Sequence, residues 1–150
     1  MIQDFRAIWW WGGRAPRRQY WLAVAVATVA TAVGVGLALS LALAEAQVLG
    51  FALCLVLLLI GVIPLAMTTM RRLQDRDRRP TWIGLIVAPG LLGDLADWLG
   101  WSGSAQAVVF IVGAAIWGLC IVELGFLPGT SGRNRFGDDP LQPSQAEAFS

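Results

Sequence analysis

Four long apolar runs, separated by short polar stretches, dominate the pattern of this chain. The first two, residues 20–44 and 48–70, contain no charged residue, and the last contains a single one, Glu123. About 20 apolar residues are enough for a helix to cross the hydrocarbon core of a bilayer. The pattern therefore predicts an all-α integral membrane protein with membrane helices at about residues 20–44, 48–70, 82–99 and 105–127.

The connections between these runs indicate how the helices pair. Only a few residues around Glu45 join the first two runs, so these helices should be antiparallel neighbours. Pro64 should kink the second helix, because proline removes one backbone donor. The third run is weaker, since it contains Pro89 and ends in two aspartates that should lie among the headgroups. We expect residues 1–141 to form one four-helix bundle and residues 142–150 to be a flexible cytoplasmic tail.

The basic residues predict the orientation of these helices. All eleven are arginines, and they fall before the first run, between the second and third, and after the fourth. Because basic residues favour the cytoplasmic side of a membrane, both termini and the middle loop should be cytoplasmic. The three clusters are Arg6, Arg14, Arg17 and Arg18; Arg71, Arg72, Arg76, Arg78 and Arg79; and Arg133 and Arg135.

Aromatic and small residues refine this picture. Six aromatic residues lie near the cytoplasmic boundary and two tryptophans near the other, as in interfacial belts. Residues 2–11 predict a short cytoplasmic interfacial segment, either a helix on the membrane surface or an irregular aromatic anchor. In the first helix, Ala30, Gly34 and Ala38 form a small-residue ridge. Such a ridge favours close packing, either inside the four-helix unit or against a second copy.

Composition supports the membrane class. Apolar residues make up 57% of the chain and charged residues 14%, whereas soluble domains contain about 25% charged residues. The net charge of +1 averages over two faces of a membrane and says little. Residues 1–18 lack the pattern of a signal peptide, so we expect the first run to remain as an anchor.

Missing residue types exclude several kinds of site. The chain has no histidine and no lysine, which removes Ser-His-Asp triads, His-ligated metals and Schiff bases. Cys54 and Cys120 lie inside apolar runs and make neither a disulfide framework nor a metal motif. We therefore expect no cofactor. Nucleic-acid binding is not expected either, because no compact basic domain stands away from the membrane.

The carboxylates and arginines admit more than one interpretation. Asp75 and Asp77 could serve a hydrolase or bind Mg²⁺, or they could neutralise the neighbouring arginines. Glu123 could be an intramembrane proton or cation site, or it could pair with Arg71 or Arg72. The arginines could bind anionic lipid headgroups or simply set the topology. The candidate cytoplasmic charge network comprises Arg14, Arg17, Arg71, Arg72, Asp75, Arg133, Asn134 and Arg135.

Three loop motifs carry a family resemblance. Residues 13–21 read Gly-Arg-Ala-Pro-Arg-Arg-Gln-Tyr-Trp, residues 71–75 read Arg-Arg-Leu-Gln-Asp, and residues 129–137 contain Gly-x-x-Gly-x-Asn-x-Phe-Gly. In this order around four apolar runs, they resemble the bacterial inner-membrane proteins of the domain-of-unknown-function 805 family. Gln74 stands where that family usually has histidine. The resemblance implies a multi-pass protein of the bacterial inner membrane but implies no activity.

These observations predict a non-enzymatic polytopic membrane protein, structural or accessory to a larger membrane assembly. One alternative is a small oligomeric transporter or channel that uses Glu123 and the polar Thr68 and Thr69. A second is a membrane enzyme that acts on lipid headgroups through Asp75 and Asp77. The expected partners are anionic membrane lipids, with further copies of the chain or other membrane proteins as additional candidates.

Overall fold

The computed structural model describes residues 6–10 and 12–141, and every regular element in this part of the chain is helical. The long helices are α2 (Arg17–Leu43), α3 (Gln47–Asp75), α4 (Ile83–Trp98) and α5 (Ser104–Ile121). A short 3-10 helix, η1 (Pro80–Trp82), precedes α4, and a π-helix, η2 (Val122–Phe126), continues α5. The all-helical class predicted from the sequence is confirmed.

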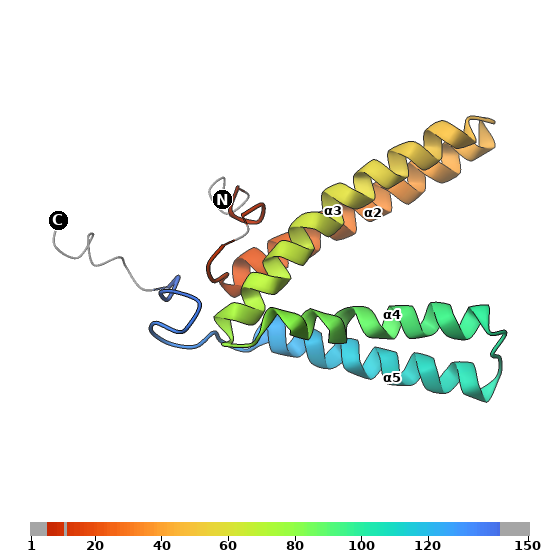
Figure 1. The fold of residues 1–150 in the computed structure, drawn as a ribbon. Helices are drawn as coiled ribbons and strands as arrows, with labels where there is room; N and C mark the ends of the chain where they lie inside the picture. The colour runs from red at the N-terminus through yellow and green to blue at the C-terminus, as the bar shows by residue number, and fades with distance from the viewer. Residues whose placement is uncertain (1–5, 11, 142–150) are drawn as a thin grey trace.

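The four long helices form two antiparallel hairpins, α2–α3 and α4–α5 (Figure 1). The hairpins meet at one end of the molecule and diverge toward the other, so the molecule has the outline of a V. Contacts between the hairpins involve η1 and η2, which both lie at the meeting point. We call this end the arginine end, because the three loops that carry the arginine clusters gather there. A closed four-helix bundle along the full length of the helices stays a prediction.

Three helical segments are long and apolar enough to cross a membrane: Arg17–Leu43, Gln47–Asp75 and Ser104–Phe126. The fourth, α4, has 16 residues. At 1.5 Å per residue it is about 24 Å long, less than the hydrocarbon thickness of about 30 Å. With η1 added at its start, α4 approaches that thickness. The third apolar run, the weakest in the sequence, thus corresponds to the shortest of the four long helices.

The hairpin α2–α3 is packed through small residues. A Cβ atom placed on Gly61 would lie 2.9 Å from Ala27 Cα, and one on Gly34 would lie 3.4 Å from Cys54 Cα. A Cβ atom placed on Gly50 would lie 3.2 Å from Ala38 Cα. The small-residue ridge of α2 therefore faces α3, and of the two alternatives it is packing within the chain that the structure confirms.

The end of α3 differs from the prediction. The helix was expected to end near residue 70, but it continues to Asp75 and so carries Arg71 and Arg72 on its last turns. Hydropathy marks where a helix leaves the membrane, whereas the backbone hydrogen bonds continue until a breaker intervenes. Here the chain turns at Asp77, which has a φ of 54°, shortly before Pro80.

The second hairpin is held by a proline and a tryptophan. Pro89 of α4 packs against Gly113 of α5, where an added Cβ would lie 3.2 Å from Pro89 Cβ. Trp117 Nε1 donates a 2.8 Å hydrogen bond to the Ile86 carbonyl oxygen, in the turn before the proline. This bond gives the Ile86 carbonyl a donor in the part of α4 where proline disrupts the helical hydrogen bonds.

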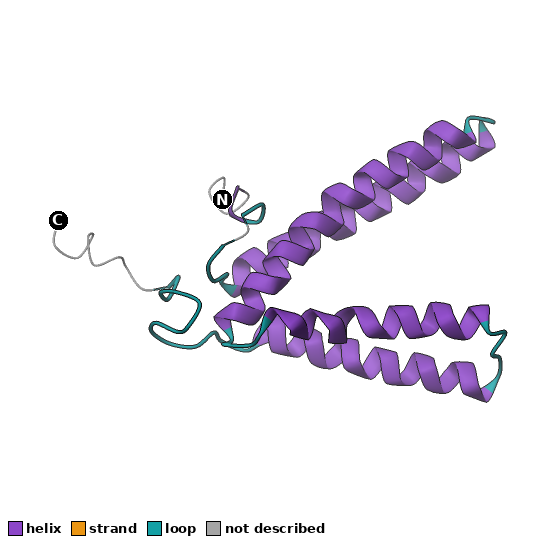
Figure 2. Ribbon diagram, in the orientation of Figure 1, coloured by secondary structure: helices purple, strands orange, loops and turns teal. Residues whose placement is uncertain are grey.

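Loops lie at both ends of the molecule (Figure 2). At the far end, residues 44–46 and 99–103 are short links between antiparallel helices. At the arginine end lie the segment 12–16 and the longer segment 127–141. Half of the predicted interfacial segment, residues 2–5 and 11, lies outside the described residues. Of the part that is described, Ile8 is fully buried while Trp9 and Trp10 are exposed. The predicted tail, residues 142–150, lies outside the described residues.

Candidate functional site

Asp75 is the centre of the arginine end. Its carboxylate accepts a 2.9 Å hydrogen bond from Arg14 Nε and a second one from Arg72 Nη1. The three side chains are nearly inaccessible, with 4% of Asp75 and 1% of each arginine exposed. Arg14 comes from the loop before α2 and Arg72 from the last turns of α3, so one carboxylate joins two segments of the chain.

The same two arginines also hold the segment that follows α5. Arg72 Nε donates to the Leu124 carbonyl at 2.8 Å, and its Nη2 donates to the Leu127 carbonyl at 2.5 Å. Arg14 donates to the carbonyls of Thr130 and Gly132. Each guanidinium thus binds both the aspartate and the backbone of a third segment. Arg14, Arg72 and Asp75, with the carbonyls that they bind, are called the clamp below.

The carbonyls at the end of η2 explain why arginine side chains are favourable beside it. The last carbonyls of any helix lack intrahelical partners and carry the negative end of the helix dipole. From residue 124 to residue 128, every carbonyl accepts a side-chain hydrogen bond. Besides the two bonds from Arg72, the donors are Trp21 to Gly125, Arg17 to Phe126 and Arg76 to Pro128.

The loop after η2 fits closely over Asp75. Thr130 donates to the Asp75 carbonyl oxygen through both its backbone N–H, at 2.8 Å, and its hydroxyl, at 3.0 Å. A Cβ atom on Gly129 would overlap the Asp75 carboxylate. Glycine at this position therefore lets the backbone approach the clamp directly.

Arg71 anchors the start of the described chain. Its Nη1 donates to the Ala7 carbonyl at 2.6 Å, and its Nη2 donates to the Arg14 carbonyl at 3.1 Å. Its Nε is buried and has no hydrogen-bond partner among the residues that the structure describes. Nearby, the buried Thr68 hydroxyl donates to the Ile8 carbonyl at 3.4 Å. Thr68 therefore binds backbone rather than facing an open pathway.

The third motif forms a turn that is held by Asn134. Its Nδ2 donates to the Gln74 carbonyl and to the Thr130 hydroxyl, both at 2.9 Å. Asp139 accepts backbone N–H bonds from Leu141 and Gly132, and these bonds lower the pKa of its carboxyl below the ordinary value. Gln74 thus contributes its backbone, not its side chain, to this contact.

The predicted charge network is only partly assembled at the clamp. Arg14, Arg17, Arg71, Arg72, Asp75 and Asn134 all contribute to the contacts around the end of α3. Arg135 instead pairs with Asp77 at 2.9 Å, where both side chains are about half exposed. Arg133 is 84% exposed, and its Nε lies 3.6 Å from Asp138. These two arginines stand outside the clamp.

Glu123 lies on η2 at the arginine end, and its predicted partners are wrong. Its Oε1 accepts bonds from Arg76 Nη2 at 3.0 Å and Nε at 3.2 Å, and Arg78 lies 3.6 Å away. Arg72 is unavailable because Asp75 and the η2 carbonyls occupy its donors, and Arg71 binds Ala7 and Arg14. The pairing itself was expected, but with other arginines.

Asp75 and Asp77, the two aspartates considered for catalysis or metal binding, differ in burial. Asp75 is buried, and both its oxygens are bound by arginines. Asp77 is half exposed and paired with Arg135. Within the described residues, no group of three or more potential ligands from His, Cys, Asp and Glu is assembled. Buried and held by two guanidiniums, Asp75 is not free to act as a base or to bind an ion.

The sequence did not predict the contacts of several residues at the arginine end. Trp21 and Arg76 bind carbonyls of the η2 segment, and Thr130 binds α3. All three lie in or beside the motifs, which was the available signal. In these contacts the acceptors are backbone carbonyls, however, and carbonyls have no sequence signature.

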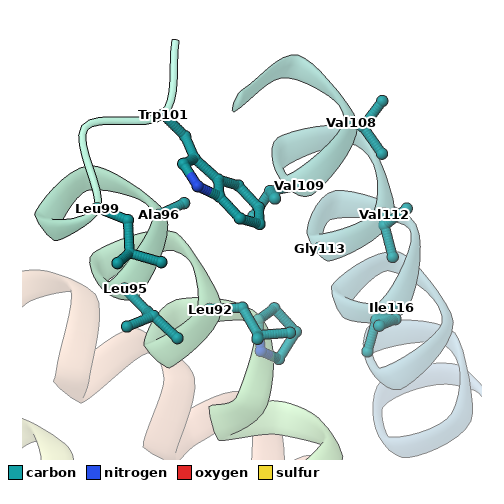
Figure 3. A pocket seen from close by; sticks show the side chains of 11 residues that line it. Leu92, Leu95, Ala96, Leu99, Trp101, Val108, Val109, Val112, Gly113 and Ile116 are labelled. Atoms are coloured by element: carbon teal, nitrogen blue, oxygen red, sulfur yellow. The ribbon is translucent and has the colours of Figure 1, made fainter. Parts of the chain in front are cut away.

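Two of the cavities along the helices have no charged residue in their walls. One, of about 250 Å³, lies between α4 and α5 at the far end, where Trp101 points toward Val109 (Figure 3). The other, of about 330 Å³, lies between the hairpins and is lined by Tyr20, Thr69 and apolar side chains.

Comparison with known proteins gives a family and nothing narrower. No curated protein and no solved structure matches the chain. The sequence pattern of one family matches residues 8–138, which include all three loop motifs and all four long helices. The match confirms the resemblance inferred from the motifs. Because it covers most of the 150 residues, the chain belongs to this family, described as Protein of unknown function (DUF805).

Proposed function

We propose that this protein is a polytopic component of the bacterial cytoplasmic membrane that acts as a structural or accessory protein and not as an enzyme. In this proposal all four helices cross the bilayer, α4 together with η1, and the arginine end lies in the cytoplasm. Eleven arginines at one end and none at the other support this orientation.

The observation that carries the proposal is the use of the arginine donors inside the chain. The guanidiniums of Arg14 and Arg72 are occupied by Asp75 and by carbonyls of the η2 segment. The side chains best suited to chemistry are thus engaged in joining the two hairpins. Such an arrangement supports a structural role for the protein rather than a catalytic one.

Cysteine labelling tests the topology. In a background with Cys54→Ser and Cys120→Ser, single cysteines are introduced as Glu45→Cys, Ser102→Cys or Ser131→Cys. With a membrane-impermeant maleimide on intact spheroplasts, the first two should react and Ser131→Cys should react only after lysis. Labelling of Ser131→Cys in intact spheroplasts would contradict the orientation. Protection of Ser102→Cys would show that α4 does not cross.

Lipid analysis tests the non-enzymatic role. Purified protein is incubated with mixed phospholipid vesicles, with and without Mg²⁺, and the lipids are measured by mass spectrometry. We expect no headgroup release. Loss of a lipid species that Asp77→Asn abolishes, in protein that remains folded, would establish the enzyme alternative instead. Asp77 is the informative position because its exposed pair with Arg135 contributes little to folding.

A further inference from the structure

The arginine end carries a groove that the clamp does not use. It is a cavity of about 420 Å³ between the start of α4 and the end of α5, against the last turns of α3. The only charged residues that line it are Arg78 and Glu123. Several wall residues are more than a third exposed, so the groove is open at the side of the helices. Its apolar walls include Leu73, Trp82, Leu85, Leu119, Leu124 and Leu127.

Arg78 differs from the arginines of the clamp in how its donors are used. Its guanidinium lies over the Trp82 ring, with Cζ 4.8 Å from the ring centroid. Its Nε is 3.6 Å from Glu123 Oε1, too far for a hydrogen bond, while Arg76 binds that oxygen at 3.0 Å. Its guanidinium donates no hydrogen bond to any described residue. Arg78 therefore presents unused N–H donors beside an apolar groove.

The charge beside the groove is positive. Glu123 faces two arginines, Arg76 and Arg78, and the exposed Arg79 follows in the chain. The nearby Asp77 is already paired with Arg135. An apolar groove with a surplus of positive charge at one end complements a ligand that has an anionic head and an apolar tail.

We propose that this groove binds one phospholipid with an anionic headgroup. An acyl chain lies along the apolar walls, and the phosphate accepts hydrogen bonds from Arg78. Guanidinium suits this role because its planar donors can bind two phosphate oxygens at once. Trp82 holds the guanidinium at the edge of the groove. The inference rests on the proposed membrane placement and deepens it by naming the lipid site.

Native mass spectrometry of the detergent-purified protein tests this site, because a neutral micelle offers no charged surface that attracts lipid non-specifically. The probes are phosphatidylglycerol and, as the net-neutral comparison, phosphatidylcholine. The wild type should retain one phosphatidylglycerol in preference to phosphatidylcholine. Arg78→Gln should weaken this retention about fivefold, the effect expected of one arginine near an anionic lipid.

Arg133→Gln is the matched control. It removes the same charge at the same end, from a side chain that is 84% exposed and outside the groove. It should retain phosphatidylglycerol as the wild type does. Equal losses in Arg78→Gln and Arg133→Gln would overturn the proposal, since they would indicate diffuse attraction to the arginine end.

A second variant, Leu85→Trp, fills the groove without changing its charge, and it keeps the test valid if Arg78→Gln does not fold. It should also weaken retention. Wild-type retention in Leu85→Trp, or displacement of the lipid by an equal concentration of inorganic phosphate, would overturn the proposal because the apolar groove would then be unused. The measurement does not depend on orientation, so a failed labelling experiment with retained lipid would contradict the proposed function alone.

Discussion

Asp75 shows how one residue can join distant parts of the chain. Its carboxylate binds Arg14 and Arg72, while its carbonyl binds Thr130. The two guanidiniums are almost completely buried, and burial of a charge is costly unless the charge is paired. Asp75 supplies that pairing for both. A neutral side chain here would leave two buried cations without an anionic partner.

We therefore expect Asp75→Asn to destabilise the protein strongly. Removal of one partner from a buried ion pair typically costs about 3–5 kcal/mol, because the remaining charge stays buried. Asp77→Asn is the matched control, since its half-exposed pair with Arg135 should be worth about 0.2–1 kcal/mol. Unfolding in mild detergent titrated with SDS measures both. Similar midpoints for the two variants would contradict the role assigned to Asp75.

Individual helices are held by two different kinds of contact. The α2–α3 pair depends on small residues that let backbones approach, as at Gly61 and Ala27. The end of α5 depends instead on polar capping, because η2 stops where side chains from α2 and α3 bind its carbonyls. Close packing thus fixes the hairpin, and hydrogen bonding fixes where the second hairpin attaches to it.

Gly61→Val tests the packing of the first hairpin. An added Cβ would lie 2.9 Å from Ala27 Cα, a backbone atom that cannot move without shifting α2. Overpacking of this kind costs about 1–3 kcal/mol. Gly36→Ala is the control, because a Cβ there meets nothing within 4 Å. In the same SDS titration, Gly61→Val should lower the unfolding midpoint, whereas Gly36→Ala should not lower it. An unchanged Gly61→Val would contradict the close contact.

The whole molecule is joined at one end. The hairpins contact each other through η1 and η2 and diverge beyond them (Figure 1). The clamp, the α2–η2 hydrogen bonds and the buried apolar cluster of Tyr20, Leu73 and Leu124 together carry the connection. The far halves of the helices keep large apolar side chains exposed. In a bilayer these surfaces face acyl chains. The angle between the hairpins thus depends on the polar and apolar contacts at the arginine end.

Spin labels on the two far loops test this arrangement. Spin labels at Glu45→Cys and Ser102→Cys are introduced in a background lacking the native cysteines. Double electron–electron resonance should give long distances between the two labels. They should clearly exceed those of a pair inside one hairpin, where packed helix axes are about 8–10 Å apart. Distances as short as those of the reference pair would show that the membrane closes the hairpins into a bundle.

The sequence by itself determined the helical class, the pairing of the first two helices and the presence of three arginine loops, because hydropathy and loop length act locally. It located Asp75 and Asn134 through their motifs. Only the tertiary structure decided where the arginine donors go, why Glu123 pairs with Arg76, and that the hairpins meet at one end. The reason is that most acceptors in this site are backbone carbonyls. Every residue has such a group, and folding alone selects which of them a guanidinium can reach.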